Sequence, residues 1–317
     1  MRLNDMAYAL AAIGLVSATT WAQDYPSRPV RIITSAPGGG SDFAARLIAT
    51  NLAPGLGQQV VVENRGGGLV APEVAARAPA DGYNLLYYGS TLWLLPLMRD
   101  KVPWDVLKDY TPVVLTVTTP TILTAHASLP VKSVRDLIAL ARSRPGEMNY
   151  ASGATGSANH LSAELFKAMA KVNIVRVVYN GQGPGILALM SGEVQTAFAV
   201  AASVLPHVKS GRLKALAVSS ATPSSLFPGL PTIAATLPGY EAVSPSGIFA
   251  PARTPEAIVT RLNQEINKVL SRSEVRERFM SSGVEVAGGS PQDLATRIRS
   301  EIAQMGKVIR EAGIRDE

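Results

Sequence analysis

The chain has 317 residues, of which 47% are apolar and 17% are charged, so it can bury one or two cores and is not a disordered composition. Its formal net charge is +6, but the basic residues are scattered along helical stretches, which argues against nucleic acid as a partner. The excess positive charge either attracts small anions or belongs to a solvated surface. Because cysteine is absent, disulfides, thiolate metal sites and an N-terminal lipid anchor on cysteine are excluded.

The first residues have the layout of a secretory signal peptide. A positive start at Arg2 precedes an apolar run from Met6 to Val16, and the segment ends with TWA, a small-x-small cleavage pattern. The run is shorter than the about 20 apolar residues of a membrane span. We therefore expect residues 1–22 to be a signal peptide and the mature chain to be a soluble, exported protein without a lipid anchor. The alternative is an amphipathic N-terminal helix of a cytosolic protein.

From Gln23 onward, short β-rich runs alternate with helical patterns. In chain order, strands are predicted at 30–33, 59–62, 84–88, 113–117, 121–125, 148–151, 175–178, 195–200, 214–218 and 247–249. Helices between them are expected to begin at Ser41 or Asp42, at Ser133, at Ser157, and at Thr254 and Ser290, each of which precedes a proline. This alternation predicts α/β architecture with a largely parallel sheet.

Two glycine-rich loops, "TSAPGGGSD" and "YASGATGSANHL", each lie between a predicted strand and a predicted helix. Ligands of open parallel sheets bind beyond the carboxyl ends of the strands, and helix N-termini offer free N–H groups and a partial positive charge. Facing each other across a cleft, the two loops would suit a small anion held between two α/β units. The alternative is that both are ordinary strand-to-helix turns, because position in a fold does not establish function.

Motifs for catalysis, nucleotides and metals are missing. The sequence has no GxxxxGK[ST], GxGxxG or GxSxG, and its three histidines form no metal-ligand pattern. Ser157 and His160 are one helical turn apart, but a serine N-cap with a histidine beside it is more typical of a structural role. Asp42 and Arg46 have the i, i+4 spacing of a helix-surface pair. The sequence therefore predicts a binding protein without cofactor or metal, and not an enzyme.

Successive blocks of the chain resemble one family. They include "YPSRPVRIITSAPGGGSDFAAR", "VVVENRGGG", "YASGATGSANHLSAELF", "VVYNGQGPGILALMSGEVQTAF" and "GIFAPARTPEAIVTRLNQEINKVL", and the match runs in order from about Tyr25 to Gly313. The chain resembles the extracytoplasmic solute-binding proteins of tripartite tricarboxylate transporters, the Bug family. The resemblance implies a two-domain periplasmic-binding-protein fold, the type II-like Venus flytrap. It also implies a monomer that closes around a small carboxylate, a di- or tricarboxylate or an aromatic acid, and delivers it to membrane permease subunits.

The resemblance also implies the site residues. The family's first-domain loop meets the carboxylate through ordered waters, and its second-domain loop grips the carboxylate; two further loops and the end of a strand complete the site. Carried over position by position, these are Ala36, Pro37, Gly38, Gly39, Gly40, Ser41 and Asp42; Ser152, Gly153, Ala154, Thr155, Gly156 and Ser157; Tyr179, Asn180 and Gly181; Ser90; and Ala199 and Val200.

The chain departs from the family's pattern at three places. The loop after Arg65 lacks two residues, which puts its part in the pocket in doubt, and Ala199 stands where the family commonly has an acidic residue. An amine-bearing ligand needs a carboxylate near its ammonium group, so we expect a carboxylate ligand without an amine. The segment "GSTLWLLPL" is also more apolar than usual, and we expect Trp93 and Leu94 near the cleft mouth.

These expectations divide the chain into residues 23–120 plus 244–317 as the first domain and 121–243 as the second. Two crossing segments, Val117–Leu123 and Ser244–Ala250, are expected to form the hinge. Two alternatives remain open at this point: a ligand-presenting accessory protein for a membrane sensor kinase, and a secreted serine hydrolase that uses Ser157 or Ser41.

Overall fold

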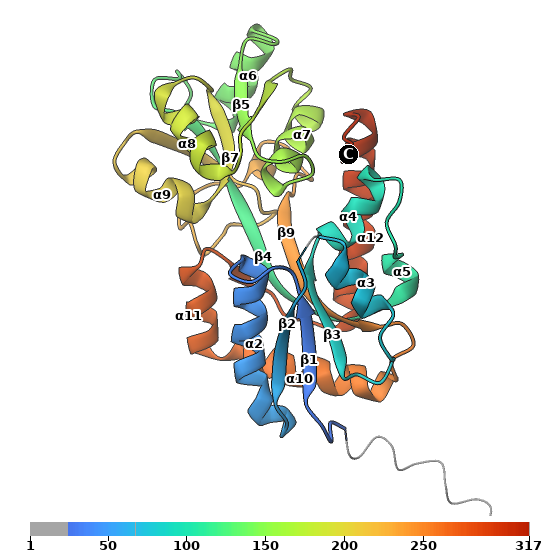
Figure 1. Cartoon of the computed structure of the whole chain (residues 1–317). Helices are drawn as coiled ribbons and strands as arrows, with labels where there is room; N and C mark the ends of the chain where they lie inside the picture. The colour runs from blue at the N-terminus through green and yellow to red at the C-terminus, as the bar shows by residue number, and fades with distance from the viewer. Residues whose placement is uncertain (1–24, 67, 317) are drawn as a thin grey trace, which may run out of the picture.

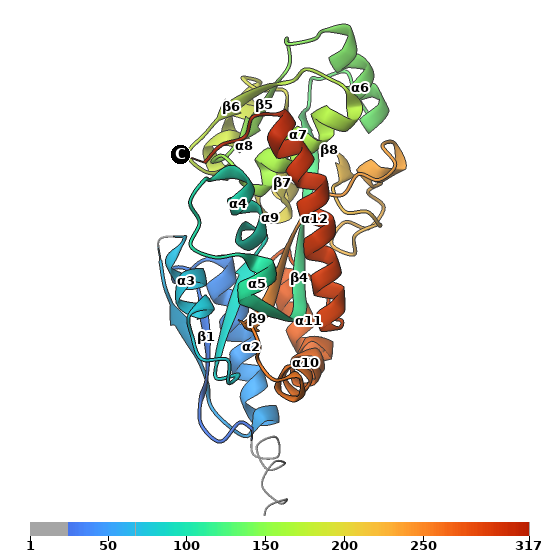
Figure 2. The ribbon, with the colours of Figure 1, turned by 90° about the vertical axis from the view of Figure 1, so that its right-hand side faces the viewer.

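The computed structural model describes residues 25–66 and 68–316, so the expected signal peptide lies outside the described residues. Its strands form one mixed sheet in the order β2-β1-β3-β9-β4-β7-β5-β6, and β8 and β10 also pair with β4. Figures 1 and 2 show a lower and an upper α/β unit joined by the long strands β4 and β9. No helix among the described residues is both long enough and apolar enough to cross a membrane.

The strands lie close to their predicted positions, with two exceptions. The predicted strands at 113–117 and 121–125 are parts of one strand, β4, and a short strand, β10, was not predicted. The strands are β1 (Val30–Thr34), β2 (Val60–Asn64), β3 (Asn84–Gly89), β4 (Tyr110–His126), β5 (Asn149–Ser152), β6 (Val175–Val178), β7 (Thr196–Val200), β8 (Leu213–Val218), β9 (Val243–Pro251) and β10 (Glu285–Val286).

Helices follow most of the strands and cover the sheet. They are α2 (Gly40–Leu56), α3 (Val70–Ala76), α4 (Thr91–Met98), α5 (Val106–Asp109), α6 (Val134–Ser143), α7 (Ala158–Ala170), α8 (Gln182–Ser191), α9 (Ala201–Lys209), α10 (Glu256–Ser271), α11 (Ser273–Ser281) and α12 (Pro291–Glu311), with a 3₁₀ turn η1 (Ile233–Ala235).

The sheet is parallel only within each unit. Strand β1 is parallel to β2 and β3, and β5 is parallel to β6 and β7. The central pairs β3–β9, β4–β9, β4–β7 and β4–β8 are antiparallel, so the prediction of a largely parallel sheet is wrong there. The reason is that the chain passes between the units twice, outward along β4 and back along β9, and the two passes run in opposite directions.

Strand β4 changes partners along its length. Residues Tyr110 to Pro120 pair with β9, whereas Thr121 to His126 pair with β7 and β8. The change falls where the sequence places the boundary between the units. The division into residues 23–120 plus 244–317 and residues 121–243, and the hinge role of the crossing segments, remain predictions.

Two predicted helix starts are confirmed by their hydrogen bonds. The Ser133 hydroxyl accepts from the Asp136 N–H at 3.1 Å at the start of α6. The Ser290 hydroxyl accepts from the Asp293 N–H at 3.2 Å, and the Asp293 carboxylate accepts from the Ser290 N–H, which makes a capping box with Pro291 in the first turn of α12.

Two other predicted starts are displaced. Helix α2 has Gly39 as its N-cap, so Ser41 and Asp42 lie in its first turn, and Asp42 bonds backward to the loop instead of capping. Helix α10 has Pro255 as its N-cap, because its backbone is extended with ψ 137°. The Thr254 hydroxyl donates to a backbone carbonyl three residues earlier and caps nothing.

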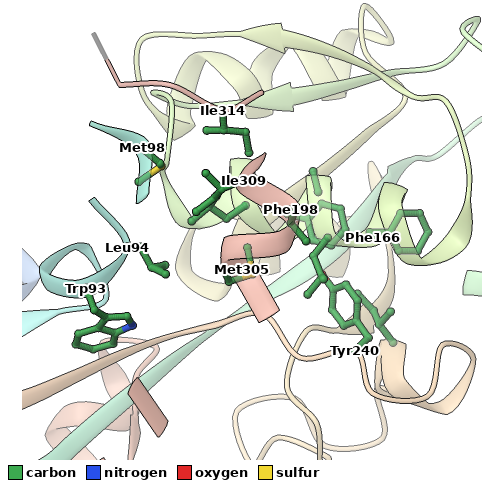
Figure 3. Close-up of a cluster of buried hydrophobic side chains, with 14 of the residues drawn as sticks. Trp93, Leu94, Met98, Phe166, Phe198, Tyr240, Met305, Ile309 and Ile314 are labelled. Atoms are coloured by element: carbon green, nitrogen blue, oxygen red, sulfur yellow. The ribbon is translucent and has the colours of Figure 1, made fainter. Parts of the chain in front are cut away.

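Three buried clusters form the core. One packs α2, α10 and α11 against β1 and β3, and another packs α8 and α9 against β7. The largest follows α12, which contacts α4, β4 and α7 and so reaches both units. Figure 3 shows Met305 and Ile309 of α12 between Leu94 and Met98 on one side and Phe166 and Phe198 on the other.

Trp93 belongs to this largest cluster. Its side chain is only 1% exposed, and its Nε1–H donates to Glu301 of α12 at 3.2 Å. Leu94 is also buried, at 2% exposure. The expectation that Trp93 lies at the cleft mouth is therefore wrong, because α12, which is distant in the sequence, covers this face of α4.

Candidate ligand-binding site

The first glycine loop joins β1 to α2. Gly38 has a φ of +81°, in the left-handed region that favours glycine. Gly39 is the N-cap of α2, with ordinary extended angles (φ −86°, ψ 172°) and no side-chain cap. The first N–H groups of α2 are therefore free of side-chain acceptors, and Gly38 allows the turn that exposes them.

Asp42 holds this loop in place. Its carboxylate accepts from the Gly38 N–H at 2.9 Å, from Asn64 Nδ2 at 2.8 Å and from Arg46 Nε at 2.8 Å. Burial opposes its ionisation, but these donors outweigh burial and lower the pKa of Asp42. Asn64 also donates to the Ser35 carbonyl at 2.9 Å. Asp42 thus braces the loop and pairs with Arg46 as the i, i+4 spacing predicts, and Asn64 is a brace that the sequence analysis missed.

A cleft of about 460 Å³ lies beside the start of α2. Its walls combine hydroxyl groups and apolar side chains, and none of its lining residues is charged. They are Gly38, Gly39, Gly40, Ser41, Phe43, Ala44, Tyr87, Val117, Thr119, Ser246, Phe279, Ser282 and Val284. Such a cleft offers N–H and hydroxyl donors on one side and apolar surface on the other.

The second glycine loop joins β5 to α7. Ser157 is the N-cap of α7 as predicted, but its hydroxyl donates to the Ala154 carbonyl and to Asn159 Oδ1 and does not cap the helix. In the first turn of α7, the His160 N–H donates to Asn159 Oδ1 at 3.0 Å, whereas the N–H groups of Ala158 and Asn159 have no side-chain acceptor. Gly156 has a φ of +75°, and a Cβ at this position would lie 2.8 Å from the Met98 sulfur, so the loop packs tightly against the end of α4.

Arg176 of β6 braces the second loop and was missed in the sequence. Its Nε donates to the Ser152 hydroxyl at 3.0 Å and one terminal nitrogen donates to the Gly153 carbonyl at 2.9 Å. Arg176 lies beside Tyr150 in the parallel pairing of β5 and β6, which brings a full positive charge to a loop already next to a helix N-terminus. A single arginine in the apolar run "VRVV" was the available signal.

His160 is not arranged as a catalytic base. Burial, followed by the charge of Arg176, lowers the pKa of His160 to about 4, so the ring is neutral at pH 7. Its Nδ1 accepts from the Gly156 N–H at 3.1 Å, while the Ser157 hydroxyl donates elsewhere. Among the described residues, no three His, Asp or Glu side chains cluster as metal ligands.

The third predicted loop, Tyr179 to Gly181, and the start of α9 adjoin the second loop. The Tyr179 N–H donates to the Ser152 carbonyl at 2.9 Å, and Gly181, with a φ of +101°, is the N-cap of α8. The Ser203 hydroxyl donates to Gln182 Oε1 at 2.9 Å, which ties the start of α9 to the start of α8. Three segments at the same end of the upper unit therefore lie together, as the parallel strands predict.

Ala199 does not line either cavity described here. It is 1% exposed and belongs to the buried cluster of the upper unit, opposite Ile122 in the pairing of β7 with β4. Its neighbour Val200 is the N-cap of α9. The next residue, Ala201, approaches the lower unit, because a Cβ on Gly283 would lie 3.7 Å from its Cβ. The start of α9 thus lies beside the turn that carries Ser282 of the cleft.

Five helices that begin at the carboxyl ends of strands have no side-chain cap at their N-terminus. Helices α2, α4, α7, α8 and α9 follow the carboxyl ends of β1, β3, β5, β6 and β7, and none receives a side-chain cap. Of the other helices, α5, α6 and α12 receive a side-chain cap, whereas α3, α10 and α11 do not. Uncapped N-termini leave backbone N–H groups and a partial positive charge for an anion.

The structure does not bring all predicted site residues to one cavity. Gly38 to Ser41 line the cleft, whereas Ser90, Gly156 and Ser157 line a smaller cavity of about 120 Å³ between α4, α7 and α12. The remaining predicted residues line neither: Ala36, Pro37, Asp42, Ser152, Gly153, Ala154, Thr155, Tyr179, Asn180, Gly181, Ala199 and Val200.

The smaller cavity has charged walls. Arg297 of α12 pairs with Glu241 at 2.7 Å, and the Nε atom of Arg297 is buried without a hydrogen-bond partner. Burial raises the pKa of Glu301 to about 7, although the Arg297 charge and the Trp93 N–H oppose the shift. This cavity adjoins residues 241–244, where the chain enters β9.

Comparison with known proteins identifies the family. The tripartite tricarboxylate transporter family receptor (TctC) matches residues 44–314. The chain belongs to this family. Protein BugT of Bordetella pertussis (strain Tohama I) is 36% identical, and the match covers 98% of both chains.

The fold is that of periplasmic binding proteins: the periplasmic binding protein BugD is 27% identical, with a TM-score of 0.70 over 92% of this chain and 100% of that one. The R. palustris protein Rpa4515 with adipate is 37% identical, with a TM-score of 0.73 over 92% of this chain and 99% of that one. MatC (Rpa3494) from Rhodopseudomonas palustris with bound malate is 31% identical, with a TM-score of 0.67 over 90% of this chain and 100% of that one. The resemblance stated from the sequence is therefore confirmed, and the chain is a solute-binding receptor of mixed α/β structure.

Proposed function

We propose that this TctC receptor works in the periplasm, captures a small carboxylate between its two units and delivers it to the permease of a tripartite tricarboxylate transporter. The observation that carries the proposal is its likeness to receptors solved with adipate and malate, over nine-tenths or more of the chain. The uncapped starts of α2 and α7 support it, because both would present N–H groups to an anion.

Domain closure is part of the proposal. The first glycine loop lines the cleft, whereas Gly156 and Ser157 of the second loop line the smaller cavity. A carboxylate that contacts both loops would stabilise the state in which they approach each other. The crossing segments of β4 and β9 would then bend, and the predicted site residues of both loops would meet the ligand together.

A thermal-shift screen tests the capture step. A matching carboxylate at about 100 times its dissociation constant stabilises the folded mature chain by about 2.7 kcal/mol, so mono-, di- and tricarboxylates should give a few discrete increases in Tm. Sugars and inorganic phosphate serve as controls. A screen in which only the controls raise Tm would contradict the proposal.

The delivery step requires a membrane partner. Purified receptor loaded with the hit from the screen should retain a permease subunit from solubilised membranes. Retention of a sensor kinase alone would favour the accessory-protein alternative. The hydrolase alternative requires that the purified chain hydrolyse esters or amides and that Ser157→Ala abolish this activity. The hydrogen bonds of Ser157 and His160 do not favour this alternative.

A further inference from the structure

The acidic side chains near the two glycine loops are already engaged. The Asp42 carboxylate accepts from three donors, which are the Gly38 N–H of its own loop, Asn64 Nδ2 and Arg46 Nε. Glu193, next to the third loop, accepts from the Tyr179 hydroxyl at 2.8 Å. Glu164, below the second loop, accepts from Lys167 at 2.8 Å and also from a tyrosine hydroxyl.

The cleft itself contributes no substitute, because its lining residues carry no carboxylate. In the smaller cavity, Glu241 is paired with Arg297, and the other carboxylate, that of the buried Glu301, accepts from the Trp93 N–H at 3.2 Å. A ligand ammonium group placed against the start of α2 would therefore lose water without gaining a counter-charge, and it would face the positive end of the helix dipole.

Aromatic and aliphatic side chains form an apolar wall on one side of the cleft. The rings of Phe43 and Phe279 pack edge to face, with centroids 6.2 Å apart at 85°. Phe43 lies in the first turn of α2 and is 37% exposed, although few large apolar side chains of the described residues are exposed to this degree. Val117 and Val284 extend the same wall. This surface gains free energy only when an apolar group covers it.

The cleft is also larger than a four-carbon acid requires. Its volume of about 460 Å³ lies within the usual range of roughly 300 to 1,000 Å³ for sites that enclose small organic ligands. A carboxylate held at the first turn of α2 leaves space for a ring or a chain of several methylene groups along Phe43.

We infer that the ligand is an amine-free carboxylate with an apolar body. Phe43, whose ring packs on the fully buried Phe279, binds this body while the start of α2 binds a carboxylate. The inference rests on the proposed function and specifies the ligand of the same site. The apolar body is either an aliphatic chain or an aromatic ring, and the experiment distinguishes the two.

Calorimetric titration of the mature chain with matched ligand pairs tests the inference. Adipate is compared with 2-aminoadipate, and 3-phenylpropanoate with phenylalanine, so that each pair differs only by the amine. In whichever pair binds, the amine-free member should bind at least about tenfold more tightly, because a buried unpaired charge costs several kcal/mol. Equal or tighter binding of the amine-bearing member would overturn the inference.

Substitution of the wall provides the second test. Phe43→Ser should weaken binding of adipate or terephthalate by about tenfold or more, the usual effect of lost apolar contact in a pocket, and should weaken succinate binding less. The matched control is Leu107→Ser on α5, which removes a side chain that is 57% exposed and is absent from the cleft. Equal losses for all acids, or no loss, would overturn the role of Phe43.

The outcomes also separate the two levels of the proposal. If no carboxylate binds the wild-type chain, the proposed function fails together with the inference. If carboxylates bind but amines are tolerated or Phe43→Ser has no selective effect, the receptor function stands and only the inference fails. A preference for terephthalate over adipate assigns an aromatic body, and the reverse assigns an aliphatic one.

Discussion

Gly38, Gly39 and Gly40 are consecutive in the chain, but the structure gives them different backbone conformations. Only Gly38 has a positive φ, at +81°, and its N–H is the donor to Asp42. At Gly39 an added Cβ would find its nearest neighbour 3.9 Å away, the Ala36 carbonyl oxygen. The conformational reason for glycine is therefore confined to Gly38, and Gly39 and Gly40 leave the start of α2 free of side chains.

Alanine substitution separates these roles. Gly38→Ala forces a side chain into the left-handed region and should lower the free energy of unfolding by about 1–2 kcal/mol. Gly39→Ala is the matched control and should change it by less than about 0.5 kcal/mol, because its backbone angles suit any residue. Urea unfolding measures both variants. Equal destabilisation by the two substitutions would contradict this assignment.

At the scale of elements, α12 connects the units in addition to the strands β4 and β9. It contacts α4 and β4 below and α7 above, and Figure 2 shows it running beside both units. Its start is the capping box of Ser290 and Asp293, whose hydrogen bonds are local to one turn. Loss of the cap should therefore loosen a helix on which the largest buried cluster depends.

Ser290→Ala is expected to lower the free energy of unfolding by about 1 kcal/mol, the typical effect of removing a serine N-cap. Ser273→Ala is a matched control, because Ser273 is the first residue of α11 and does not cap it. Chemical unfolding compares the two variants. The assignment would be wrong if Ser273→Ala were as destabilising as Ser290→Ala.

At the scale of the whole molecule, the buried charges of the smaller cavity make stability depend on pH. Burial raises the pKa of Glu301 from 4.5 to about 7, Arg297 and Trp93 oppose the shift, and the Glu241 charge adds to it. The folded chain thus binds more protons than the unfolded chain between these two values. The contribution of Glu301 to the free energy of unfolding is therefore fully present below pH 4.5 and is lost as the pH rises through about 7.

Glu301→Gln removes this titration and keeps an acceptor for the Trp93 N–H. Between pH 5 and pH 8, the wild type should lose about 2–3 kcal/mol of unfolding free energy relative to the variant. His160 acts in the opposite direction: its pKa falls from 6.5 to about 4, so its contribution is lost as the pH falls through this range. The contribution of His160 is the same in both proteins, so it cancels when the unfolding free energies of wild type and variant are subtracted. Identical pH profiles of the two proteins would refute the role of Glu301.

Much of the fold and family was predictable because the signals are local. Helix starts at Ser133 and Ser290 follow from contacts within one turn, and the strand-to-helix loops follow from hydrophobic runs that end in glycine. The family resemblance also used contiguous motifs, and the family and solved structures confirm it. The Asp42–Arg46 pair followed from helical spacing alone.

The sequence by itself determined the α/β class, the position of the two glycine-rich strand-to-helix loops and the family, because each is encoded in short stretches of chain. Only the tertiary structure decided that Trp93 is buried under α12, that Ala199 lies in a core and that Asn64 and Arg176 brace the two loops. It also decided that the central strands are antiparallel and that the two loops line no common cavity. The reason is physical: burial and bracing depend on which distant segments pack together, and the local spacing of residues does not predict those partners.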